Sequence, residues 1–271
     1  MADTSTSNAP AGIAHKPGSP CWVDVASPDV AASGRFYSGL FGWQAEPVAD
    51  PEAGGYTFLT LGGDVVGAVG PLQEGQVPAW TVYFKTLDAE ATGALVEDFG
   101  GKVVVPAFDV LKSGRMAVFQ DPGGAFFAVW QSKEMPGFSK SHQPNTFGWA
   151  ELNERGDSQV VNFYTSVFAW EVKLTEAGGG APPYVEWQID GESIGGAIDL
   201  ADIPDMPADM PPFWLVYFLV SDIGASTSKV TELGGAVQKP PATYPGGRFS
   251  IVSEPSGAVF ALMQMDPSTP G

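Results

Sequence analysis

The sequence has a single cysteine, Cys21, and no stretch of apolar residues long enough to span a membrane. One cysteine excludes an internal disulfide and suits a reducing compartment, and a membrane helix needs about 20 consecutive apolar residues. Residues 1–19 lack the basic start and apolar stretch of a secretory signal and predict a flexible tail. We therefore expect a soluble, cytoplasmic protein.

Positive charge and histidine are scarce as well. Thirteen Lys and Arg residues stand against 31 Asp and Glu residues, which gives a formal net charge of −18. Such a surface repels nucleic acids and anionic membranes, so we expect neither as a partner. The two histidines, His15 and His142, lie outside the expected strands. They therefore offer no metal ligands at the positions where a strand would present them.

What the sequence does contain is a long repeat. Residues 21–43, CWVDVASPDVAASGRFYSGLFGW, return as residues 148–170, GWAELNERGDSQVVNFYTSVFAW. The offset is constant, as Phe36 and Phe163 show (163 − 36 = 127). A repeat of this length predicts two domains, each with its own core. The expected organisation is a tail over 1–19, a domain over 20–131, a linker over 132–145, a domain over 146–265 and a C-terminal tail over 266–271.

Within each half, the pattern strand-helix-strand-strand-strand is expected twice. Alternating residues predict a strand over 22–26, and apolar residues at helical spacing predict a helix over 30–41 that Gly42 ends. Ser27, followed by Pro28, predicts the N-cap of that helix. The other elements expected in the first half are a helix over 88–99 and strands over 56–61, 65–69, 80–85, near 102–105, 116–120 and 125–131.

The repeated pattern resembles the vicinal oxygen chelate family, which includes glyoxalase I, extradiol dioxygenases and bleomycin-resistance proteins. The resemblance depends on a Phe-Tyr pair in the first helix of each half, the Gly-Gly pairs 100–101 and 234–235, and the turns that begin with Asp121-Pro and Glu254-Pro. The segments WVDV (22–25), WAELN (149–153), GRMAV (114–118) and DPGG (121–124) are similar to two-domain glyoxalase-like proteins typified by a mycobacterial antigen.

The resemblance implies an α+β fold of tandem vicinal oxygen chelate domains, in which four βαβββ units form two half-barrel cavities. It also implies a monomer with internal pseudo-twofold symmetry, because the duplication supplies both halves of a dimer. Catalytic members of the family bind a metal on the first and last strands of the units. The matching positions here are Trp22, Trp149, Ala128 and Ala261, which cannot bind one. The expectation is therefore no metal and no other cofactor.

Asp24 and Glu151 lie two residues beyond those tryptophans, hence on the same strand face. They could contribute to a metal site only if both reached one cavity. A carboxylate on an apolar face is costly unless it is paired. We expect either salt bridges with Arg115 and Arg248 or carboxyl groups of raised pKa that act as acid or base or bind a ligand amine.

The sequence also predicts an aromatic pocket in each half, which suits a flat, hydrophobic ligand. The second pocket is more polar, because Asn153 stands where the first half has Ala26. The leading hypothesis is metal-free binding of a hydrophobic or aromatic small molecule. The alternatives are a metal-independent tailoring enzyme that uses Asp24 or Glu151, a metal-dependent lyase or dioxygenase, and an interaction protein with vestigial cavities. The candidate ligand-binding residues are Trp22, Tyr56, Trp80, Arg115 and Trp130 in the first half and Trp149, Asn153, Tyr184, Trp214 and Arg248 in the second.

Overall fold

The computed structural model describes residues 13–156, 158–176, 183–203 and 206–266. The predicted outer ends of both tails and the Gly178–Gly180 turn lie outside these ranges. The first half contains β1 (Pro20–Ser27), α1 (Val30–Phe41), β2 (Gln44–Pro47), β3 (Thr57–Leu61), β4 (Asp64–Pro71), β5 (Ala79–Lys85), α2 (Ala89–Asp98), β6 (Lys102–Val110), β7 (Gly114–Gln120) and β8 (Phe126–Ser132). The second half contains β9 (Phe147–Glu154), α3 (Ser158–Phe168), β10 (Glu171–Thr175), β11 (Tyr184–Ile189), β12 (Glu192–Asp199), β13 (Phe213–Leu219), α4 (Ile223–Glu232), β14 (Ala236–Tyr244), β15 (Gly247–Ser253) and β16 (Val259–Met265).

Each half forms one eight-stranded mixed sheet. The strand order is β2-β3-β4-β1-β5-β8-β7-β6 in the first half and β10-β11-β12-β9-β13-β16-β15-β14 in the second. The central strands β1 and β5 are antiparallel, and each pairs with a parallel strand on its outer side, β4 and β8. The same arrangement recurs around β9 and β13. The α+β fold with βαβββ units is therefore confirmed, and both units of a half share one sheet.

Local signals placed most elements correctly. Helix α1 spans Val30–Phe41 as predicted, and Gly42 ends it with φ +74°. The N-cap is Asp29 rather than Ser27, because its side chain accepts a hydrogen bond from the backbone N–H of Ala32. Strand β2 was missed, since all four of its residues are exposed and give no hydrophobic alternation.

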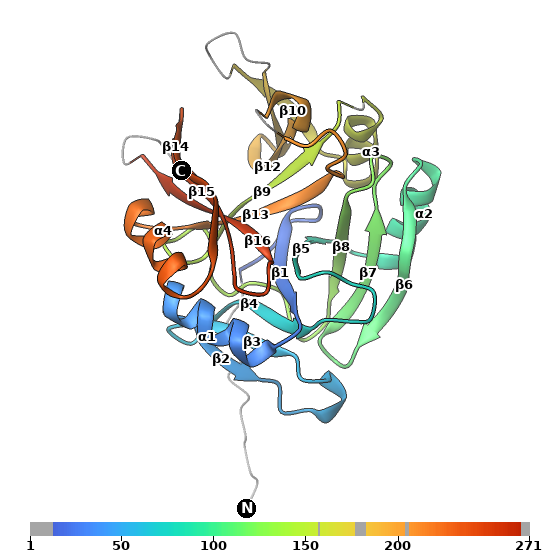
Figure 1. Ribbon diagram of the computed structural model, residues 1–271. Helices are drawn as coiled ribbons and strands as arrows, with labels where there is room; N and C mark the ends of the chain where they lie inside the picture. The colour runs from blue at the N-terminus through green and yellow to red at the C-terminus, as the bar shows by residue number, and fades with distance from the viewer. Residues whose placement is uncertain (1–12, 157, 177–182, 204–205, 267–271) are drawn as a thin grey trace, which may run out of the picture.

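The prediction that each half has its own core is wrong. A single hydrophobic cluster runs through both halves, because helices and aromatic rings of one half pack against the sheet of the other. Helix α1 lies beside α4, and α2 lies beside α3 (Figure 1). The ring of Phe218 in β13 lies 5.3 Å from Phe41 and 4.9 Å from Trp80 of the first half. The ring of Phe84 in β5 lies 5.1 Å from Trp214 of the second half.

The segments expected to be a tail and a linker are packed where they are described. Lys16 forms ion pairs with Asp190 and Glu192 of the second half, at 3.2 and 3.0 Å. The indole of Trp170 donates to the carbonyl of Gly18 at 3.0 Å. Phe138, in the predicted linker, is 1% exposed and donates its backbone N–H to the carbonyl of Cys21. These contacts attach both segments to the domains.

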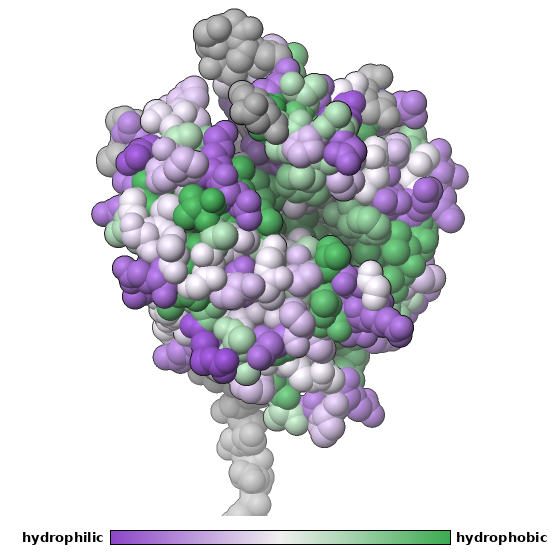
Figure 2. Space-filling model, viewed as in Figure 1, coloured by the Kyte–Doolittle hydropathy of each residue, from purple (hydrophilic) through white to green (hydrophobic). Residues whose placement is uncertain are grey.

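The surface has a hollow near the centre of the side drawn in Figure 2, with hydrophobic side chains on its walls and polar ones around the periphery. No helix among the described residues is long and apolar enough to cross a membrane.

Candidate functional site

The first half holds a carboxyl group between two tyrosines. The hydroxyls of Tyr56 (just before β3) and Tyr83 (β5) donate to Oδ2 of Asp24 (β1) at 2.8 and 2.9 Å. The indole of Trp22 donates in turn to the Tyr56 hydroxyl at 3.0 Å. Trp22 pairs with Tyr83 across the antiparallel strands β1 and β5, which places their side chains on one face. We call the face of each sheet that carries this carboxyl its inner face.

The second half has the same kind of arrangement, with a glutamate in place of the aspartate. The hydroxyls of Tyr184 (β11) and Tyr217 (β13) donate to the two carboxyl oxygens of Glu151 (β9) at 2.8 and 2.7 Å. The indole of Trp149 donates to the Tyr184 hydroxyl at 3.0 Å. The structure therefore brings together three predicted site residues of each half and adds Tyr83 and Tyr217. The sequence carried a signal for this pair, because both tyrosines recur in the matching segments WTVYF and WLVYF.

Burial explains the electrostatics of both carboxyl groups. Loss of solvent raises the pKa of Asp24 from 3.8 to about 6, and the hydrogen bonds from the tyrosines oppose this rise. The pKa of Glu151 is raised for the same reason, and its two tyrosines and the charge of Lys239 oppose the rise. Each group thus gains or releases a proton closer to neutral pH than an exposed acid does.

The placement of Trp80 and Trp214 on the inner faces is wrong. Trp80 pairs with Val25, one residue out of phase with Asp24, so its side chain points to the opposite face. Its indole donates to the hydroxyl of Tyr37 in α1 at 2.9 Å, and it is 6% exposed. Trp214 does the same with Tyr164 of α3 at 2.9 Å. Both tryptophans belong to the core that the halves share.

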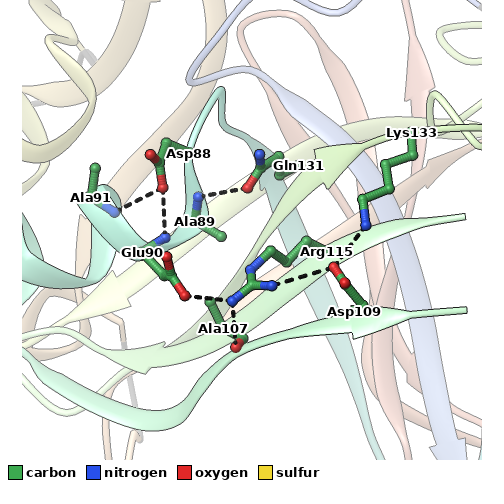
Figure 3. A network of polar contacts seen from close by, with 9 residues as sticks. All are labelled: Asp88, Ala89, Glu90, Ala91, Ala107, Asp109, Arg115, Gln131 and Lys133. Carbon is green, nitrogen blue, oxygen red and sulfur yellow. Dashed lines mark hydrogen bonds and ion pairs between the residues drawn. The ribbon is translucent and has the colours of Figure 1, made fainter. Parts of the chain in front are cut away.

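The expected salt bridges to the acids are also wrong. Arg115 (β7) pairs with Glu90 of α2 at 2.5 Å and with Asp109 of β6 at 3.4 Å, and it donates to the carbonyl of Ala107 (Figure 3). Its register neighbour on β8 is Gln131, on the helix-covered face, so it points away from Asp24. Arg248, paired with Gln264 in the equivalent position, is exposed.

The inner face of the first half is covered by the chain that follows β8. The ring of Phe138 lies 5.7 Å from that of Trp22, which is only 3% exposed. The indole of Trp130, on the same face, donates to the carbonyl of Met135 at 2.8 Å. For the first half, therefore, Trp22 and Trp130 fill space beneath the linker.

The inner face of the second half is more accessible. Trp149, the counterpart of Trp22, is half-buried, as are Phe213, Tyr244 and Phe249 around it. Together with the buried residues Leu215, Tyr217, Ala261 and Met263 they form a hydrophobic cluster separate from the shared core. Asn153 is buried, and its side-chain amide donates a hydrogen bond to the backbone carbonyl of Glu151 at 3.2 Å. The amide is therefore engaged within β9. On this face, aromatic walls surround the carboxyl group of Glu151.

A glycine makes room for the longer acid in the second half. Glu151 lies beside Gly196 in the parallel register of β9 and β12, whereas Asp24 lies beside Ala68. A Cβ at Gly196 would come within 2.4 Å of the Tyr184 ring carbon Cζ and closer still to the hydroxyl. Glu151 is one methylene longer than Asp24. Its neighbour Gly196 is one methyl smaller than Ala68, so the total volume of each pair is similar.

We expect Gly196→Ala to destabilise the protein by about 1–3 kcal/mol, because Tyr184 must move away from the position at which it reaches Glu151. Urea unfolding followed by tryptophan fluorescence measures this loss. Gly224→Ala in α4 is the control, since a Cβ there meets only Asp222 at an ordinary contact distance of 3.4 Å. Equal effects of the two substitutions would contradict the proposed fit.

A cavity of about 240 Å³ lies elsewhere, between α2 and β6. Ala89, Gly93, Val103 and Phe119 form its apolar part, and Glu90 and Glu97 lie at its edge. It is on the far side of the first sheet from Asp24 and includes none of the predicted site residues.

Comparison with known proteins agrees with the doubled fold. The sequence model described as "Glyoxalase/Bleomycin resistance protein/Dioxygenase superfamily" matches residues 21–129 and again residues 147–262. The chain belongs to this superfamily. Within it, the chain is 39% identical to "Anthracycline biosynthesis protein DnrV" of Streptomyces peucetius over 264 residues, covering 92% of this chain and 94% of that protein. It is 34% identical to "Putative glyoxylase CFP32" of Mycobacterium bovis, covering 93% and 97%.

Solved structures of other proteins share the architecture. The 2,3-dioxygenase LapB from Pseudomonas sp. KL28 superimposes with a TM-score of 0.63 at 14% identity, over 95% of this chain and 97% of that one. A Mn(II)-bound glyoxalase from Novosphingobium aromaticivorans gives 0.62 at 16% identity, over 92% and 82%. At these identities the likeness establishes the fold alone.

The residues on the inner faces do not fit the divalent metal of catalytic superfamily members. Each face places one carboxyl group between its tyrosines, whereas a divalent cation needs several converging oxygen or nitrogen donors. Glu186, on the same face as Glu151, is engaged by Lys173, Thr175 and Ser193. The neighbouring tyrosines remain protonated, because burial and the nearby acid raise their pKa. Within the described ranges, no three His, Cys, Asp or Glu side chains gather as a metal-binding group.

Proposed function

We propose that this protein binds a flat aromatic small molecule on the inner face of its second half without using a metal ion. The observation that carries the proposal is the half-buried aromatic cluster around Glu151, whose carboxyl is held by Tyr184 and Tyr217. Aromatic walls give affinity to a flat ligand, and a few fixed polar groups orient it. The first half contributes structure, since Phe138 lies over its equivalent face.

The names of two relatives suggest a narrower chemical class for the proposed ligand. DnrV and DauV, at 39% and 38% identity, are both named anthracycline biosynthesis proteins. We propose a polycyclic aromatic ligand of that chemical type, whose flat rings can stack on the aromatic walls of the site. Sequestration or carriage of such a compound requires only binding, which the inner face supports.

Titration with 1,8-dihydroxyanthraquinone, followed by quenching of tryptophan fluorescence, tests this function. We expect one molecule bound per chain and at least a tenfold loss of affinity in Trp149→Leu, because a stacking wall is removed and Tyr184 loses the indole that donates to its hydroxyl. Trp22→Leu is the matched control, since it changes the equivalent indole under the linker. Binding that persists in Trp149→Leu, or that disappears only in Trp22→Leu, would reject the second-half site.

A second candidate function is metal-independent acid–base catalysis on the same ligand class. It is favoured by the raised pKa of Glu151, a property of groups that exchange protons during reactions. Mass spectrometry of the ligand after prolonged incubation separates the two functions. A product made by the natural chain and absent with Glu151→Gln, which still binds the ligand, would establish the enzyme. Unchanged ligand in both samples would leave binding as the function.

A further inference from the structure

An ammonium group, that of Lys239, lies at the edge of the second-half inner face and has no acidic partner among the described residues. Lys239 in β14 is half-buried, and its Nζ lies 4.8 Å from the ring centroid of Phe249 in β15. Its carbonyl accepts a hydrogen bond from Ser250 at 2.7 Å, which fixes the backbone. No residue that the structure describes forms an ion pair with this ammonium, although the chain has 31 acidic residues.

The charge of Lys239 acts on the carboxyl group of Glu151. It is one of the groups that lower the pKa of Glu151 against the effect of burial. Glu151 itself accepts hydrogen bonds from Tyr184 and Tyr217, and it forms no ion pair with the lysine. The ammonium, held over an aromatic ring by a cation–π contact, therefore remains available to a bound molecule.

The first half has no equivalent cation. Lys239 pairs with Ile251 across β14 and β15, and the matching pair in the first half is Val105 with Val118. The second half thus has a cation at a position where the first half has none. The inner face of the first half carries a different cation, Lys85 at the end of β5, whose ammonium donates a hydrogen bond to the hydroxyl of Ser132. In a chain of net charge −18, a local cation is what an anionic ligand needs to overcome long-range repulsion.

We infer that Lys239 pairs with an ionised acidic group on the ligand, such as a carboxylate or a phenolate, so that the protein selects acidic polycyclic aromatics over neutral ones. This inference rests on the proposed function, because it specifies the ligand of the same site. An amine-bearing ligand fits less well, since the carboxyl of Glu151 already accepts two hydroxyl donors in a buried setting.

Two probes of the same shape and different charge test the inference, namely anthraquinone-2-carboxylate and anthraquinone-2-carboxamide. In a buffer of about 50 mM salt, where screening is weak, we expect the natural chain to bind the carboxylate about tenfold more tightly than the amide. Lys239→Gln should abolish this preference and leave amide binding unchanged. Lys239→Arg should retain the preference, and so should Lys229→Gln, which changes an exposed lysine of α4.

The outcomes separate this inference from the proposed function. Equal binding of both probes by the natural chain, tighter binding of the amide, or a preference that survives Lys239→Gln would overturn the role of Lys239 while aromatic binding stands. Failure of both probes to bind, together with failure of 1,8-dihydroxyanthraquinone, would overturn the proposed function itself.

Discussion

Phe218→Ala should lower the free energy of unfolding by about 3–5 kcal/mol, the range for removing a fully buried aromatic side chain. The ring is 0% exposed and lies between the halves, with centroids of Phe41, Trp43 and Trp80 at 5.3, 5.3 and 4.9 Å. Because this core is continuous, we also expect the two halves to unfold in a single transition. Phe84→Ala, on the other side of the shared core, should have an effect of the same size.

Urea unfolding followed both by far-ultraviolet circular dichroism and by tryptophan fluorescence measures this change. Phe126→Ala is the control, because Phe126 is 55% exposed and its truncation creates no internal cavity. Two separated transitions in the natural chain, or a loss of stability no greater than in Phe126→Ala, would show that the halves are energetically independent.

Asp24→Asn should stabilise the protein at neutral and alkaline pH. Burial raises the pKa of Asp24 to about 6 in the folded state, against 3.8 in the unfolded chain. The carboxyl therefore favours folding below pH 3.8, and this contribution is lost as the pH rises through 6. The full difference corresponds to about 3 kcal/mol. Asparagine keeps an oxygen that accepts the hydroxyls of Tyr56 and Tyr83, yet it does not ionise.

The measurement is the difference in unfolding free energy between Asp24→Asn and the natural chain from pH 5 to pH 8. We expect the advantage of the variant to grow by about 1.5 kcal/mol over this range. Lower pH is avoided because the isoelectric point is about 4.2. Asp98→Asn, which changes an exposed carboxylate in α2, serves as the control. An advantage that is constant or that shrinks as the pH rises would contradict a raised pKa.

Much of the fold could be predicted from the sequence, because the duplication shows the weak local patterns for helices, strands and turns twice. Helix α1 and its terminal Gly42 follow from local propensity, and the aromatic residues of α1 return in α3, where Ala169 stands in place of Gly42. The two-residue period of a strand correctly placed Asp24 beside Trp22 on one face. These features depend on neighbours in the chain, which a sequence displays directly.

Features that depend on the pairing between strands were harder to predict from the sequence. Placing Trp80 on the face of Trp22 required the register of β1 and β5, and an error of one residue reverses every side chain. The same limit applied to Arg115, whose true partner Glu90 lies on a helix 25 residues away. The cover that Phe138 provides could not be predicted either, because the segment around it has no periodicity.

The cross-packing of the helices has a consequence for any half of the chain produced alone. The aromatic surface of β13 that receives Phe41 and Trp80, and the surface of β5 that receives Trp214, would both face water. An exposed hydrophobic patch of that kind promotes association with other protein surfaces. Because each half packs against the other and their sequences repeat, the complementary surface is carried by an identical copy of the fragment. A half-length fragment should therefore pair with itself as a symmetric homodimer or precipitate, and it should not persist as a monomer.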